Sequence, residues 1–181
     1  MQFFLIILLS LVSAIVYGIV HDQITARICV EYFTIGHPPV FNTESPTLLA
    51  FGWGVIATWW VGLMLGIPLA FAARLGASRP LAAKELIGPI AILLGIMGAG
   101  AFFAGLIAFT LASKGTIRIP SAFTSSVPAS KHIPFVVDMW THSASYLFGF
   151  VGGIILIGRI WYKREKSIRP SPATTPTNQP K

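Results

Sequence analysis

Four long apolar stretches, each separated from the next by a polar segment, dominate the pattern along the chain. They cover roughly residues 3–20, 48–73, 87–112 and 139–161, and none carries Asp, Glu, Lys, Arg or His in its middle third. Each is close to the ~20 residues that a helix needs to cross a hydrocarbon core of about 30 Å. Because backbone polar groups in lipid must be satisfied internally, such stretches are helical. The pattern predicts an all-α protein, a four-helix transmembrane bundle in up-down-up-down order, with residues 1–166 as a single integral membrane domain.

Composition agrees with a membrane location. Of the 181 residues, 54% are hydrophobic and 10% are charged, whereas a soluble domain carries about 25% charged residues. This composition excludes a soluble globular protein, and the lipid bilayer is the first expected partner.

The net charge of +7 is distributed unevenly. Nine basic residues lie between the second and third stretches, at the end of the fourth stretch or beyond it: Arg74, Arg79, Lys84, Arg159, Lys163, Arg164, Lys166, Arg169 and Lys181. Short loops rich in Lys and Arg mark the cytoplasmic face, so both termini are predicted in the cytoplasm and loops 21–47 and 113–138 on the outer side. Topology explains the charge, and no nucleic-acid partner is expected.

The two ends of the chain need separate interpretation. Val12-Ser13-Ala14 resembles a signal-peptide cleavage site, but no basic residue precedes it and the apolar stretch continues to Val20. The first stretch is therefore expected to remain as a true span. Residues 167–181, rich in Pro, Thr and Ser, are predicted to be a disordered cytoplasmic tail.

The segment 21–35 predicts a short helix along the membrane interface. Ile24, Ile28, Tyr32 and Ile35 recur at spacings of four, four and three residues, which places an apolar stripe on one side. Glycine and proline at 36–39 end this helix.

Small residues recur within the spans and predict close packing of the helices. Gly62 and Gly66 form a small-xxx-small pair in the second stretch, and Pro68 is expected to bend that helix. The third and fourth stretches are also rich in glycine: Gly95, Gly98, Gly100, Gly105, Gly149, Gly152 and Gly153.

Histidine and acidic residues gather on the predicted outer side. His21-Asp22 closes the first stretch, and Asp138 and His142 stand one helical turn apart where the last stretch begins. These two ends lie at the same depth in an antiparallel bundle, so the four side chains can converge. Imidazole and carboxylate together suit Zn, Mn, Fe or Cu(II), and they also suit a proton relay. The candidate metal ligands are His21, Asp22, Asp138 and His142, with Glu31 and His37 as further candidates.

Ordinary polar residues at a membrane surface would give the same pattern, so several functions stay open. The chain contains no G-x-S-x-G, P-loop, C-x-x-C or H-E-x-x-H motif, and no enzyme class is indicated. Transporters place ionisable residues at mid-membrane, which disfavours a small-solute transporter. A structural or accessory protein with a membrane or periplasmic protein partner is favoured over a metal or proton site, and the cofactor is either none or a transition metal ion.

The stretch YGIVHDQITARICVEYFTIGHP (17–38) resembles a motif of an uncharacterised family of small bacterial four-span membrane proteins. The resemblance rests on Tyr17-Gly18, His21-Asp22-Gln23, Thr25 and Glu31-Tyr32-Phe33-Thr34, and residues 140–153 are similar to the family's last span. Relatives commonly have proline where this chain has Val30. The resemblance implies a four-span fold in the bacterial inner membrane, and it implies no particular activity.

Overall fold

The computed structural model describes residues 1–166, and the predicted disordered tail, 167–181, lies outside the described residues. All regular elements within 1–166 are helices, as the apolar pattern predicted. Four helical segments are long and apolar enough to cross a membrane: Gln2–Ile28, Pro46–Arg74, Ala83–Ser113 and Ala129–Lys166. The prediction of an all-α chain with four candidate spans is confirmed.

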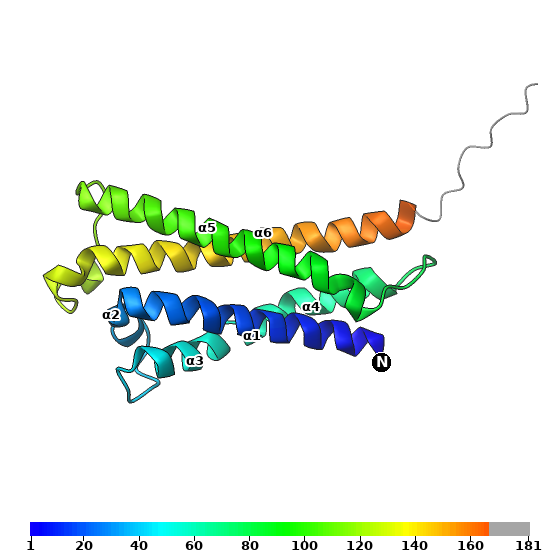
Figure 1. Cartoon of the computed structure of the whole chain (residues 1–181), viewed down its shortest axis with the longest axis horizontal. Coiled ribbons are helices and arrows are strands. Elements are labelled where there is room, and N and C mark those ends of the chain that lie inside the picture. The colour runs from blue at the N-terminus through cyan, green and yellow to red at the C-terminus, as the bar shows by residue number, and fades with distance from the viewer. Residues whose placement is uncertain (167–181) are drawn as a thin grey trace, which may run out of the picture.

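The helices lie lengthwise beside one another in an elongated bundle (Figure 1). In chain order they are α1 (Gln2–Ile28), α2 (Val30–Thr34), α3 (Pro46–Ile56), α4 (Trp59–Arg74), the 3-10 turn η1 (Ala83–Leu86), α5 (Ile87–Ser113), the 3-10 turns η2 (Ser121–Phe123) and η3 (Ala129–Lys131), and α6 (His132–Lys166).

The bundle consists of two packed units that meet along one seam. α1 packs along α3 and α4, α5 packs along α6, and α4 joins the units through α6. The C-terminal end of α1 and the N-terminal end of α6 lie at the same end of the bundle (Figure 1). The outward surface of the helices carries many exposed apolar side chains, among them Phe102, Phe103 and Ile154, which is the surface that hydrocarbon would cover.

The first long helix extends further than the predicted stretch 3–20. α1 continues to Ile28 because Asp22, Thr25 and Ala26 are buried against the rest of the bundle. At Cys29 the backbone is extended, with φ −148° and ψ 95°, and α2 forms one short helix after it. The predicted helix over 21–35 is thus divided between the end of α1 and α2.

The second candidate span is interrupted at Ala57 and Thr58, between α3 and α4. The sequence predicted only a bend at Pro68, which lies inside α4. Side chains satisfy the backbone at the interruption: the Thr58 hydroxyl donates to the Gly54 carbonyl, and the Tyr146 hydroxyl donates to the Ala57 carbonyl over 3.1 Å. A broken helix inside a membrane is typical of proteins that bind a ligand between their spans.

Glycines allow the close approach of α1 to α3 and α4. A Cβ added to Gly54 would lie 2.6 Å from the backbone of Ile19, and one added to Gly62 would lie 2.8 Å from Cα of Leu11. In α5 only some of the glycines are closely packed: Gly100 and Gly105 contact α6, whereas Gly95 and Gly98 have open space where a Cβ would stand. In α6, a Cβ at Gly149, Gly152 or Gly153 would lie within 3.0 Å of a side chain of α4 or α5. The small-residue prediction therefore holds for α4 and α6 and for part of α5.

Arg164 fixes the opposite end of the bundle. Its side chain is 5% exposed, and its guanidinium donates hydrogen bonds to the backbone carbonyls of Ala72, Leu75, Ser78 and Arg79. These contacts hold the end of α6 against the loop that follows α4.

Candidate metal centre

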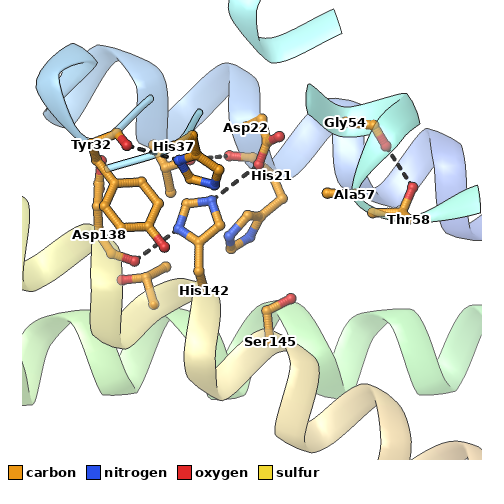
Figure 2. Close-up of polar contacts among 12 residues, drawn as sticks. His21, Asp22, Tyr32, His37, Gly54, Ala57, Thr58, Asp138, His142 and Ser145 are labelled. Carbon is orange, nitrogen blue, oxygen red and sulfur yellow. Dashed lines mark hydrogen bonds and ion pairs between the residues drawn. The ribbon is translucent and has the colours of Figure 1, made fainter. Parts of the chain in front are cut away.

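Three of the predicted ligands meet at one place between α1 and α6. His21, Asp22 and His142 each offer one ligand atom, and these atoms all lie within 4.8 Å of one another. Figure 2 shows the two imidazole rings side by side, with the carboxylate of Asp22 next to His142. Residues that stand 120 positions apart in the chain thus converge, as the matching depth of the two helix ends predicted.

The imidazole of His142 is oriented through both of its nitrogens. Nδ1 lies 2.8 Å from the backbone carbonyl of Asp138, and Nε2 lies 3.2 Å from Oδ1 of Asp22. A carbonyl oxygen can only accept a hydrogen bond, so Nδ1 of His142 carries a proton. In the neutral ring, Nε2 then has no proton and its lone pair faces the Asp22 carboxylate. Two acceptors this close need a proton or a cation between them. Metal-binding histidines commonly have this arrangement, with the second nitrogen donating to a backbone carbonyl.

His21 contributes a buried nitrogen. Among the described residues, its Nε2 is buried and has no hydrogen-bond partner. The ring stacks on Tyr17 with centroids 5.7 Å apart and meets His142 edge to face at 4.7 Å. Buried polar atoms are rarely left unpaired, so this nitrogen is the second candidate ligand atom.

Asp138 lies next to this group but outside it. Its side chain is 0% exposed, and within residues 1–166 neither carboxylate oxygen has a hydrogen-bond partner. The pKa of the Cys29 thiol is raised to about 12, chiefly by burial; a hydrogen bond with the Tyr32 backbone opposes the rise, and the Asp138 carboxylate contributes to it. Burial also raises the pKa of Tyr32, and the charge of Asp138 is the next cause. Asp138 therefore lies beside Cys29 and Tyr32, and its backbone carbonyl orients His142.

Glu31 and His37 have other partners. Glu31 pairs with Lys131 at 3.3 Å and accepts from the Cys29 thiol at 3.5 Å. Burial tends to raise the pKa of Glu31, but hydrogen bonds from its own backbone and from Lys131 outweigh burial and lower that pKa. Nδ1 of His37 lies 2.8 Å from the Tyr32 carbonyl, and burial lowers the pKa of this ring. The structure thus places both outside the group of three.

A long cavity begins at these three residues and continues between the helices. The empty space between its walls comes to about 1090 Å³ with open solvent included, and Tyr17, Tyr32, Ser145 and Tyr146 are among the residues that line it. The hydroxyls of Tyr17 and Ser145 are 2.9 Å apart, joined by a hydrogen bond from α1 to α6.

A pattern of polar residues within the first apolar stretch indicates this cavity. Ser10, Ser13, Tyr17 and His21 recur at spacings of three, four and four residues, and all four line the cavity. This spacing puts them on one face of α1. A polar stripe on an otherwise apolar helix indicates a face turned away from lipid.

No protein-family model, no curated protein and no solved structure matches the chain.

Proposed function

We propose that the protein is a four-span protein of the bacterial inner membrane that binds a divalent transition metal ion through His21, Asp22 and His142. The observation that carries the proposal is the convergence of three ligand atoms within 4.8 Å, from the first and last long helices. Two imidazoles and one carboxylate suit Zn or Fe(II). Three protein ligands leave coordination positions open, which is typical of sites where an ion acts on a further ligand.

Zinc binding by the detergent-purified protein tests the proposal. We expect about one zinc ion per chain, bound with an affinity that His142→Ala lowers about 100-fold or more, because a ligand nitrogen is lost. His142→Gln is the second variant in case the alanine variant unfolds. Elemental analysis of the purified protein, together with zinc titration of metal-free protein, measures both quantities.

His132→Ala is the matched control. His132 begins α6, and its Nε2 bonds to the Val127 carbonyl at 3.0 Å, outside the group of three. Its loss should leave zinc binding unchanged. Equal zinc affinity in wild type, His142→Ala and His132→Ala would rule out the proposed site.

The proposal includes an orientation: up-down-up-down spans, both termini in the cytoplasm, the metal site toward the outer side, and α2 at the outer interface. The distribution of Lys and Arg supports it. A green fluorescent protein fused after Lys181 should fluoresce, and alkaline phosphatase fused at the same point should be inactive. Active phosphatase at that point would reverse the orientation. An accessory role with a membrane or periplasmic partner stays a prediction of the sequence.

A further inference from the structure

The cavity extends from the group of three toward the opposite end of the bundle. It is lined on α1 from Ser10 to Asp22 and on α6 from His142 to Ile157. At 1.5 Å per residue, these segments cover about 20 Å of helix. The cavity is therefore long enough for an extended chain rather than a compact solute.

The chemical character of the wall changes along this length. One end carries His21, Asp22 and His142, with Tyr32 and His37 beside them. The wall farther along α4, α5 and α6 is aliphatic, and its members include Leu65, Leu69, Ile90, Leu93, Leu94 and Leu156. A ligand matched to this wall has one polar end and one apolar end.

Water is a poor occupant of the aliphatic part. A buried water needs two to four polar partners. On this part of the wall the leucine and isoleucine side chains offer none, and the hydroxyls are those of Ser10 and Ser13 on α1, of which Ser10 already donates to the Ile6 carbonyl. An empty space would cost these side chains their dispersion contacts. An apolar chain fills the space without either cost.

Aromatic side chains also line the polar end. They are Phe33 of α2 and Trp53 of α3, which are buried at 2% and 8% exposure. A cation bound by the group of three would have open positions there, and oxygen anions are favourable ligands for such a cation. A carboxylate is such a ligand.

The interrupted span contributes to the same wall. Ala57 and Thr58 line the cavity. The Tyr146 hydroxyl donates to the Ala57 carbonyl, and the Thr58 hydroxyl donates to the Gly54 carbonyl one turn earlier. Irregular backbone at membrane depth is tolerated where it is buried in protein or lines a cavity. The interruption therefore belongs to the construction of the cavity.

We infer that the cavity binds a long-chain fatty acid, with its carboxylate at the group of three and its chain along α4, α5 and α6. The inference rests on the proposed metal function, since the ion supplies the positive charge at the head. It goes beyond that function by naming the class of the ligand.

Native mass spectrometry of the purified protein with added palmitate tests the inference. Zinc-loaded wild type should bind about one palmitate per chain, and removal of zinc should weaken binding about 10-fold, or about 1.4 kcal/mol. Methyl palmitate lacks the carboxylate charge, so its weaker binding should not depend on zinc.

The variant Met97→Trp tests the binding of the fatty-acid chain separately from the binding of its head group. Met97 lines the aliphatic part of the cavity, so an indole there should lower palmitate affinity about 10-fold while zinc binding stays unchanged. Met64→Trp is the matched control, because Met64 is 44% exposed on α4 and should change neither. Leu94→Phe, on the same wall, replaces Met97→Trp if that variant does not fold.

The possible failures are distinguishable. Zinc binding by wild type without palmitate binding overturns this inference and leaves the metal function intact. Palmitate binding that responds to neither zinc nor Met97→Trp overturns it as well. Absence of zinc binding in wild type overturns the metal function, and with it the assignment of the head group.

Discussion

Replacing Gly54 by leucine should push α1 away from α3 and lower the free energy of unfolding by about 3 kcal/mol or more. The reason is the contact with a backbone rather than with a flexible side chain. A Cβ at Gly54 would lie 2.6 Å from both N and Cα of Ile19, and the facing Gly18 has its own Cβ position 2.6 Å from the Gly54 carbonyl. Neither helix can yield without displacing the other, because each presents backbone to its neighbour.

Unfolding in mixed detergent micelles, followed by tryptophan fluorescence, measures this loss. Gly95→Leu is the matched control, since Gly95 is exposed in α5 and has nothing within 4 Å of its Cβ position. That variant should be neutral or slightly stabilising, because leucine favours a helix over glycine by up to about 1 kcal/mol. Equal destabilisation by the two substitutions would show that the contact between α1 and α3 is not tight.

Arg164→Ala should lower the free energy of unfolding by about 4 kcal/mol. The guanidinium donates to the carbonyls of Ala72 and Ser78, both in buried hydrogen bonds, and also to those of Leu75 and Arg79. Alanine would leave these carbonyls without their donor. Lysine keeps the charge but lacks the planar fork of five donors, so Arg164→Lys should recover only part of the loss.

Arg159→Ala provides the comparison on the same helix. Arg159 is exposed, so its loss should change the free energy of unfolding by less than about 0.5 kcal/mol. Thermal unfolding of the three variants in one detergent makes the measurement. If Arg164→Ala unfolds at the same temperature as Arg159→Ala, the guanidinium does not hold the end of α6.

The four spans could be predicted from sequence because length and the absence of charge leave few alternatives for an apolar stretch. The end of the first long helix could not be predicted in the same way. The apolar stretch ends at Val20, before His21-Asp22, whereas the helix α1 continues without a break to Ile28. Hydropathy measures the cost of polar groups in lipid, and it does not register that a neighbouring helix can shelter them.

Part of the candidate site followed from the sequence for a geometric reason. Two helix ends at one depth bring His21 and His142 together, but depth does not fix which carboxylate joins them. Asp22 joins the group, while Asp138 lies beside Cys29 and Tyr32. The interruption at Ala57 and Thr58 was also beyond prediction, because the hydroxyl that bonds to the Ala57 carbonyl comes from Tyr146, 89 residues away.

The seam between the two packed units has a consequence for biogenesis. His21 and Asp22 belong to α1, the first helix to be synthesised, whereas His142 belongs to α6, the last of the described helices. A growing chain therefore offers two of the three ligands long before the third exists. The coordination set is completed only when the second unit docks on the first, so under the proposed function metal occupancy distinguishes a finished bundle from a partly inserted one.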